Sequence, residues 1–423
     1  MKISVVGGGY VGLVSSACFA ELGHNVNIIE IDCNKVEAIN SGEPPIYEKG
    51  LDGLLSRHAG ENLMATDSYD VIPESDLSFI CVGTPPGPDG NADLSMVASA
   101  SRSIGRYLRD GEGYHVVVVK STVPPGTTEE LVIPTVLEEA RGRSDDIGFA
   151  MNPEFLREGM AVYDFMHPDR IVIGSREGGA GDLAESAYSG IDSPVLRVGI
   201  RAAEMIKYAS NAMLATKISF SNEVGNICKD LDIDVYEVMR GVGLDHRISP
   251  HFLNSGAGFG GSCLPKDVSA LIRLAESLGE YPVLLKSVIE VNERQPHRLV
   301  KLLEEKIGDL FGKEVAVLGL AFKGDTDDVR DSRAIKVILD LKEKGASVKA
   351  YDPLAIPNAR KVVPDIKYCR SAAEALEGCD AGLIMTEWAE FASLDEEFDM
   401  MKSRVILEGR RILSCEDAEG ICW

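Results

Sequence analysis

The sequence predicts an α/β fold in which two doubly wound parallel sheets are joined by a helical central region. Nearly unbroken apolar runs alternate with helical segments from the N-terminus, and the same pattern restarts at residues 314–318. Between them, residues 201–231 are rich in Ala and Met and contain no proline, which favours one long helix. A chain of 423 residues is also too long for a single hydrophobic core. We therefore expect three domains, over residues 1–198, 199–300 and 301–423.

The composition argues against several classes of partner and site. A net charge of −24 disfavours nucleic acid and anionic membranes, so an anionic ligand must be met by local Lys, Arg and helix N-termini. The nine cysteines lack a C-x-x-C pair and the seven histidines lack ligand spacing, so we assign neither a disulfide framework nor a metal. No apolar run reaches the roughly eighteen residues of a membrane span, and the N-terminus reads as a strand rather than a signal peptide. We expect a cytoplasmic protein.

The first strand, residues 3–6, runs into Gly-Gly-Gly-Tyr-Val-Gly, which fits the pattern G-x-G-x-x-G. A helix closed by Gly23 follows, and a second strand over residues 26–31 carries Glu30 near its end. This order is typical of a Rossmann-like dinucleotide site, in which the acid binds the ribose hydroxyls. Because an acid repels a 2′-phosphate, we predict NAD as the cofactor in preference to NADP. The predicted cofactor residues here are Gly7, Gly9, Tyr10, Val11, Gly12 and Glu30.

Hydroxyl side chains follow the next two strands, residues 77–83 and 114–120. Thr84 comes after the first strand, and Ser121 and Thr122 come after the second. Ligands of doubly wound sheets bind at the carboxyl edge of the strands, so we expect polar contacts from these residues there.

Two pairs of polar residues are spaced four apart. Glu154 and Glu158, in the segment Asn-Pro-Glu-Phe-Leu-Arg-Glu-Gly, could share one face, and two solvated glutamates are the competing interpretation. Lys207 and Asn211, in the long helical segment, project from one face beside apolar neighbours. A lysine that lays its stem on apolar surface is the alternative there. A long helix of this kind also commonly provides a dimer surface.

The stretch Gly-Ala-Gly-Phe-Gly-Gly-Ser-Cys-Leu-Pro-Lys-Asp, residues 256–267, changes from a glycine-rich loop to a helix start. Cys263 lies just before that helix, where the macrodipole favours an anion. With Lys266 three residues on, this position lowers a thiol pKa and favours a nucleophile. The alternative is a small apolar residue at a loop–helix junction.

A second Rossmann-like start follows the strand at residues 314–318. Its turn reads Gly-Leu-Ala-Phe-Lys-Gly, so Ala321 replaces the middle glycine and Lys323 is added. The turn therefore suits an ammonium presented to a phosphate better than a dinucleotide. Further strands are expected at residues 347–351, 382–386 and 404–407.

Taken together and in this order, these motifs resemble the UDP-glucose/GDP-mannose dehydrogenase family. The matching pieces include Gly-Gly-Gly-Tyr-Val-Gly, Asn-Pro-Glu-Phe-Leu-Arg-Glu, Glu-Met-Ile-Lys-Tyr-Ala-Ser-Asn, Phe-Gly-Gly-Ser-Cys-Leu-Pro-Lys-Asp and Leu-Ala-Phe-Lys. The resemblance implies two Rossmann-like domains, for NAD and a nucleotide sugar, that flank a helical dimerisation region. It also implies oxidation of the sugar C6 alcohol to a carboxylate with two NAD+ and one water, through a cysteine thiohemiacetal and thioester.

The resemblance also implies roles for individual residues. Cys263 matches the nucleophile, and Lys207 and Asn211 match the groups that stabilise the C6 oxygen. Glu154 and Asp267 match carboxylates of proton transfer and water activation, with Thr122 orienting the water; which carboxylate is the hydrolytic base stays open. Further cofactor positions are Lys35, Thr84, Ser121, Thr122, Glu158, Lys266 and Arg330. Substrate positions are Glu154, Phe155, Leu156, Arg157, Glu158, Lys207, Asn211, Arg247 (from a neighbouring subunit), Phe252, Leu253, Asn254, Ser255, Gly256, Phe259, Gly260, Phe322, Lys323 and Arg410.

The motifs favour UDP-glucose as the sugar nucleotide. Gly-Leu-Asp-His-Arg-Ile and the cysteine loop resemble the UDP-glucose branch, whereas the tail Ala-Glu-Gly-Ile-Cys-Trp resembles GDP-mannose enzymes. GDP-mannose and UDP-N-acetylhexosamines are the alternative substrates. A single-step hydroxyacid dehydrogenase would need no nucleophilic cysteine, and a non-catalytic binding protein would not be expected to keep Cys263, Lys207 and Glu154. We expect at least a homodimer.

Overall fold

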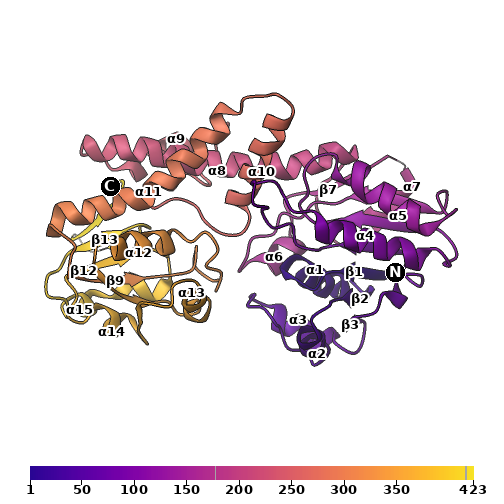
Figure 1. The fold of residues 1–423 in the computed structure, drawn as a ribbon, viewed down its shortest axis with the longest axis horizontal. Coiled ribbons are helices and arrows are strands. Elements are labelled where there is room, and N and C mark those ends of the chain that lie inside the picture. Colours follow the sequence, from indigo (N-terminus) through magenta and orange to yellow (C-terminus); the bar gives the residue numbers. More distant parts are fainter. Residues whose placement is uncertain (177, 415–416) are drawn as a thin grey trace. The chain divides into compact units, whose positions relative to one another are not determined.

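The computed structural model describes residues 1–176, 178–414 and 417–423. The chain folds into two compact units, Met1–Ser210 and Asn211–Trp423, each built around its own sheet (Figure 1). The fold class predicted from the sequence is confirmed, with two Rossmann-like sheets and a helical region between them in the chain. The three-domain division at residues 198 and 300 stays a prediction.

The first unit contains a sheet in the order β3-β2-β1-β4-β5-β6-β7-β8. The chain order reverses between β1 and β4, so the switch point lies where these two strands end. The strands are β1 (Lys2–Val6), β2 (Asn25–Ile29), β3 (Leu63–Thr66), β4 (Leu77–Ile80), β5 (His115–Val119), β6 (Ile147–Met151), β7 (Ile171–Ser175) and β8 (Val195–Val198).

One strand pair departs from the predicted parallel arrangement, because β6 and β7 are antiparallel. The connection between them contains only the six-residue helix α6 (Ala161–Met166). A parallel crossover usually contains a helix that carries the chain back along the length of the strands, and α6 is too short to do so. The chain therefore stays at the carboxyl edge after β6 and re-enters the sheet from there.

Helices cover both faces of this sheet. Within β5, Val116 and Val118 pack against one helical layer, whereas Val117 and Val119 pack against the other. This period of two is what a strand buried on both faces requires. One layer holds α1 (Tyr10–Glu21), α3 (Leu51–His58), α6 and α7 (Gly178–Ser186), and the other holds α4 (Ser95–Leu108) and α5 (Ile133–Ala140); α2 (Cys33–Asn40) follows β2.

The predicted long helix is α8 (Ile200–Asp230), which has 31 residues. The second unit then contains α9 (Val235–Gly243), α10 (Leu264–Ser277) and α11 (Val283–Ile307). Its sheet is parallel throughout, in the order β11-β10-β9-β12-β13-β14. The strands are β9 (Glu314–Leu318), β10 (Ser347–Tyr351), β11 (Lys367–Tyr368), β12 (Ala381–Ile384), β13 (Ile406–Glu408) and β14 (Ala418–Gly420), and the later helices are α12 (Arg333–Glu343), α13 (Ile356–Val362), α14 (Ala372–Leu376) and α15 (Asp395–Phe398).

Candidate active site

The turn between β1 and α1 has the backbone shape that a dinucleotide requires. Gly7 has a φ of +106°, which side-chain-bearing residues rarely adopt. A Cβ on Gly12 would lie 1.9 Å from Gly7 O, whereas a Cβ on Gly9 would meet nothing within 4 Å. Gly9 is also the N-cap of α1 and provides no side-chain cap. The start of α1 therefore keeps open space and backbone N–H groups for a phosphate.

Glu30 lies directly after β2 and is only 8% exposed. Its two carboxylate oxygens accept hydrogen bonds from Gly8 N and Asp32 N, both over 3.0 Å. These bonds fix the carboxylate beside the glycine turn, where an acid binds the ribose of NAD. Lys35, another predicted cofactor residue, lies in α2 and is partly exposed.

The hydroxyl residues after β4 and β5 do meet at one edge of the sheet. Thr84 Oγ1 donates to the backbone carbonyl of Thr122 over 2.9 Å. Ser121 Oγ donates to Val82 O over 2.7 Å, so this hydroxyl is already used in joining the two strand ends. Thr122 is partly exposed at the same edge.

Glu154 and Lys207 form a buried ion pair within the first unit. Glu154 Oε1 lies 2.9 Å from Lys207 Nζ, and the two side chains are 6% and 4% exposed. Glu154 Oε2 accepts from Leu156 N over 2.6 Å. Burial alone would raise the pKa of Glu154, but the charge and hydrogen bond of Lys207 outweigh it and hold the pKa below its usual value. The interpretation of a solvated Glu154 is therefore wrong.

The segment that carries Glu154 and Glu158 is not helical, so their four-residue spacing does not create a shared helical face. Its Pro153 disfavours a helical residue before it, and β6 ends just ahead. Arg157, a predicted substrate residue, instead forms an exposed ion pair with Asp164 of α6.

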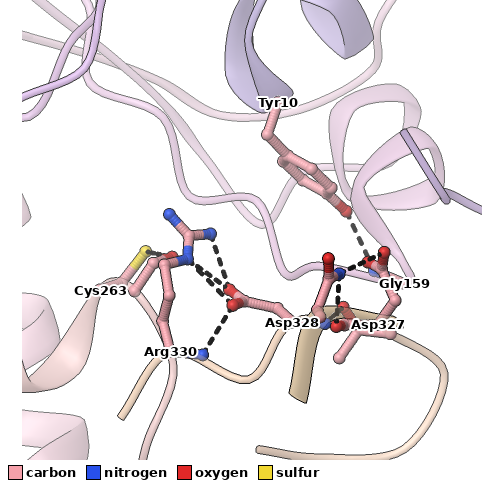
Figure 2. Close-up of polar contacts among 9 residues, drawn as sticks. Tyr10, Gly159, Cys263, Asp327, Asp328 and Arg330 are labelled. Carbon is pink, nitrogen blue, oxygen red and sulfur yellow. Dashed lines mark hydrogen bonds and ion pairs between the residues drawn. The ribbon is translucent and has the colours of Figure 1, made fainter. Parts of the chain in front are cut away.

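Glu48, which was not predicted as a site residue, joins this segment to the glycine turn. Tyr10 donates its hydroxyl to the carboxylate of Glu48. Glu48 is buried and accepts from Gly159 N over 2.7 Å and from Ala161 N over 2.8 Å. Gly159 N also donates to the Tyr10 hydroxyl over 3.0 Å. Figure 2 shows the Tyr10 side chain directed toward Gly159. An isolated acid in a loop gives no sequence signal for such a contact.

In the second unit, Cys263 is the N-cap residue of α10, and its side chain is exposed. Pro265 occupies the first turn, as predicted, and Asp267 N donates to Cys263 O over 2.9 Å. The Ser262 hydroxyl lies 3.5 Å from Cys263 Sγ. The helix N-terminus stabilises a thiolate at this position, which is the form that acts as a nucleophile.

Asn211 and Asp267 are bonded to each other in the same unit. Asn211 Nδ2 donates to Asp267 Oδ2 over 2.6 Å, and both residues are buried. Lys266 Nζ lies 2.5 Å from Asp267 Oδ1. The predicted cofactor residue Lys266 is thus the ion-pair partner of a predicted catalytic carboxylate.

The glycine loop before Cys263 is held by amide side chains that the sequence analysis did not identify. Asn292 of α11 accepts from Phe259 N over 2.7 Å and donates to Phe259 O over 3.0 Å. Asn222 of α8 accepts from Gly256 N over 2.7 Å. A Cβ on Gly260 would lie 2.4 Å from Asp331 O, so this glycine is needed for close backbone packing. Leu253 and Ser255 are buried, whereas Phe252 and Asn254 are exposed.

The predicted arginines have different surroundings. Arg247 is 78% exposed at its side chain and pairs with Asp245. Arg330 pairs with Asp328 in the same way, as Figure 2 shows, and its backbone carbonyl accepts from Gly261 N of the cysteine loop over 2.9 Å. Arg410 donates to the carbonyl of Gly258, in the same loop.

The second Rossmann-like turn, like the first, donates from its backbone amides to a carboxylate that follows the next strand. Asp352, directly after β10, is 1% exposed and accepts from Leu320 N over 2.7 Å and from Ala321 N over 3.0 Å. Trp388 Nε1 donates to the same oxygen over 3.1 Å. Asp352 thus fixes this turn as Glu30 fixes the glycine turn. Phe322 and Lys323 follow in this turn and are partly exposed.

Two further findings concern the part of the chain that the structure describes. No group of three or more His, Cys, Asp or Glu side chains there has the arrangement of a metal site. None of its helices combines the length and apolar character needed to cross a membrane.

Comparison with known proteins identifies the family. Three models of the UDP-glucose/GDP-mannose dehydrogenase family match: the NAD binding domain at residues 1–192, the central domain at 201–294 and the UDP binding domain at 316–415. UDP-glucose 6-dehydrogenase AglM of Haloferax volcanii is 48% identical over 98% of this chain and 97% of its own length, and TuaD of Bacillus subtilis is 44% identical over 99% and 91%. A UDP-glucose dehydrogenase structure from Pyrobaculum islandicum matches with a TM-score of 0.96 and 46% identity, covering 100% of this chain and 98% of that one. The chain therefore belongs to the UDP-glucose/GDP-mannose dehydrogenase family and is an NAD-dependent dehydrogenase.

Proposed function

We propose that this chain is a UDP-glucose 6-dehydrogenase, which oxidises the C6 alcohol of UDP-glucose to a carboxylate. The balanced reaction converts UDP-glucose, two NAD+ and one water to UDP-glucuronate, two NADH and three protons. Relatives named UDP-glucose 6-dehydrogenase at 48% and 44% identity support this substrate. The observation that carries the four-electron reaction is the exposed Cys263 at the N-terminus of α10.

When bound, NAD+ would supply the hydride acceptor for each of two oxidations, one molecule of NAD+ for each. In the first, the C6 alcohol becomes an aldehyde. The Cys263 thiolate then forms a C–S bond to C6, and the oxygen takes a proton to give a thiohemiacetal. The second oxidation gives a thioester. Water attacks its carbonyl carbon, the C–S bond breaks, and the carboxylate and the Cys263 thiol are released.

The remaining residues supply charge and proton transfer. We assign Lys207 and Asn211 to the stabilisation of negative charge on the C6 oxygen, because an ammonium and an amide N–H are the donors an oxyanion requires. Glu154 and Asp267 are the two candidates for the base that activates water, and Thr122 orients that water. A carboxylate whose pKa is held low, as that of Glu154 is, stays ionised and able to accept a proton at neutral pH.

The test is a panel of nucleotide sugars assayed for NADH formation and for sugar consumed. We expect UDP-glucose to give the highest kcat/KM and two NADH for each sugar. One NADH for each sugar would overturn the four-electron reaction. A higher kcat/KM with GDP-mannose or with a UDP-N-acetylhexosamine would keep the reaction and replace the substrate.

We further propose that the chain forms a homodimer or a larger homo-oligomer built on α8. Four apolar side chains of this helix are 40% to 60% exposed and recur at seven- or eight-residue intervals: Met205, Met213, Phe220 and Ile227. That spacing places them along one stripe of a helix. The exposed Arg247 is assigned to the substrate of the neighbouring subunit, so activity would depend on assembly.

A further inference from the structure

Lys120 is the first residue after β5, and its ammonium lies inside the first unit. The residue is 3% exposed. Nζ donates to Asn152 Oδ1 over 3.0 Å and to the Tyr188 hydroxyl over 2.8 Å. The rings of Phe79, Phe165 and Tyr188 have their centroids 5.5 to 5.9 Å from Nζ. Among the described residues, the direct partners of this buried cation are neutral, and a buried charge without a paired carboxylate is costly enough to call for a reason.

The neighbours of Lys120 do not neutralise its charge. Burial raises the pKa of Cys18 on α1 and of Cys81 after β4 to about 12, so both thiols are protonated at neutral pH. Burial also raises the pKa of Tyr188. Glu21, at the end of α1, pairs instead with Arg57 and His58 near the surface.

The buried acid that Lys120 does affect is Glu154. The charge of Lys120 lowers the pKa of Glu154, after the effects of burial, of Lys207 and of the Leu156 N–H. Cys81 is another titratable group near Glu154 within this unit. The Glu154–Lys207 pair is neutral as a whole, so Lys120 leaves one positive charge in excess.

Lys120 also fixes the backbone that leads to Glu154. Asn152, two residues before Glu154, donates from its backbone N to Val119 O over 2.8 Å. Its side-chain Nδ2 donates to Val172 O over 2.9 Å, and its Oδ1 accepts from Lys120 and from the Tyr188 hydroxyl. Because every polar atom of this side chain is bonded, the end of β6 and the start of the Glu154 segment are locked through Lys120.

We propose that Lys120 is a positioning residue for the oxidation, which holds Asn152 in place and adds a second buried positive charge acting on Glu154. Two lysine charges that act on one carboxylate keep that carboxylate ionised and favour negative charge on a nearby substrate oxygen. Salt screens this effect much less than it screens surface charges, because the groups are buried. The inference rests on the proposed function, because Lys120 acts through Glu154, which is proposed there as a candidate base.

The main test compares Lys120→Met with Tyr188→Phe. Methionine keeps an unbranched side chain but removes the charge. Tyr188→Phe removes the two hydrogen bonds of the Tyr188 hydroxyl, with Lys120 and with Asn152, and leaves the charge. We expect Lys120→Met to move the acid limb of the kcat/KM profile up by about one pH unit and to lower kcat at neutral pH roughly tenfold. The KM for NAD should stay within about threefold of the wild-type value, and Tyr188→Phe should leave the acid limb in place.

A second variant, Asn152→Asp, keeps Lys120 but pairs it with a new carboxylate. It should also move the acid limb upward, because the added negative charge opposes ionisation of Glu154. Infrared spectroscopy can follow the titration of Glu154 in each variant without substrate or cofactor. The carboxyl band of Glu154 is the one that disappears in Glu154→Gln. An unchanged Glu154 titration in both Lys120→Met and Asn152→Asp would overturn the proposal. Failure of the wild type to oxidise UDP-glucose would overturn the proposed function instead, while the infrared result would still report on Lys120.

Discussion

Lys207 Nζ lies 2.9 Å from Glu154 Oε1, and neither side chain is more than 6% exposed. The pair joins the helix α8 to an irregular segment after β6, so it links two parts of the first unit that are distant in sequence. Removing one partner of a buried pair leaves an uncompensated charge, which is more destabilising than losing both. We therefore expect substitutions in this pair to change the stability of the protein as well as its activity.

Lys207→Met should destabilise the protein by roughly 3–5 kcal/mol at neutral pH. In the wild type, the lowered pKa of Glu154 contributes stability above the ordinary pKa of a glutamate, and this contribution is lost as the pH falls through the lowered value. Without Lys207, burial should raise the pKa of Glu154, so the variant should instead regain stability as the pH falls. Urea unfolding from neutral pH down to values below the ordinary pKa of a glutamate measures both slopes. Lys217→Met, on the same helix, is the control, and equal pH slopes for wild type and Lys207→Met would contradict this account.

Cys263→Ser should reduce turnover to less than about a tenth of the wild-type rate, because a serine hydroxyl is a poorer nucleophile than a thiolate at neutral pH. Binding of NAD and of UDP-glucose should be nearly unchanged, as measured by calorimetry. Cys33→Ser is the matched control, since Cys33 is also exposed but lies at the start of α2. Turnover above a tenth of the wild-type rate would remove Cys263 from the mechanism.

Gly12→Ala and Gly9→Ala should separate folding from cofactor binding. A Cβ at Gly12 would lie 1.9 Å from Gly7 O, so we expect a loss of about 1–3 kcal/mol or more of unfolding free energy. A Cβ at Gly9 meets no protein atom within 4 Å, and its φ of −73° suits alanine, so stability should change by less than about 0.5 kcal/mol. NAD affinity should still fall in Gly9→Ala, because the methyl group enters the space left for the phosphate. Equal thermal stabilities of the two variants would contradict the geometry.

Local patterns predicted much of the fold. The expected strands 314–318 and 347–351 coincide with β9 and β10, because continuous apolar runs between turn residues mark buried strands. The position of Cys263 before α10 followed from the change from glycines to Pro-Lys-Asp. The antiparallel β7 was missed, since strand direction depends on how the chain crosses the sheet and not on residue pattern.

Partners across the sequence were harder to predict. Lys120 could be seen only as the end of an apolar strand, and its contact with Asn152 depends on the register of β5 and β6. Glu48 and Asn292 are polar residues without a motif, and their roles come from backbone amides brought near by folding. Sequence reasoning found the residues that carry a motif and missed those that hold the motif in place.

Glu30→Ser should narrow the preference for NAD over NADP. Serine can no longer accept from two N–H groups or repel a 2′-phosphate, so the ratio of the two kcat/KM values should fall by about tenfold or more. Asp32→Ser is a suitable control, because Asp32 is the N-cap of α2 and serine also caps helices well. Equal kcat/KM values for NAD and NADP in the wild type would contradict the role of Glu30.

Phe220→Asp should weaken the proposed assembly on α8. Phe220 is 53% exposed near the middle of the stripe formed by Met205, Met213, Phe220 and Ile227. At −24 for each chain, subunits repel one another at long range, so apolar burial has to supply the association and moderate salt should not dissociate it. Light scattering at the assay concentration should give a dimer or larger species for the wild type and a smaller species for Phe220→Asp, with lower turnover. Phe311→Asp, which alters an exposed phenylalanine outside α8, should change neither mass nor turnover. A wild-type monomer that turns over at full rate would contradict both the interface and the role assigned to Arg247.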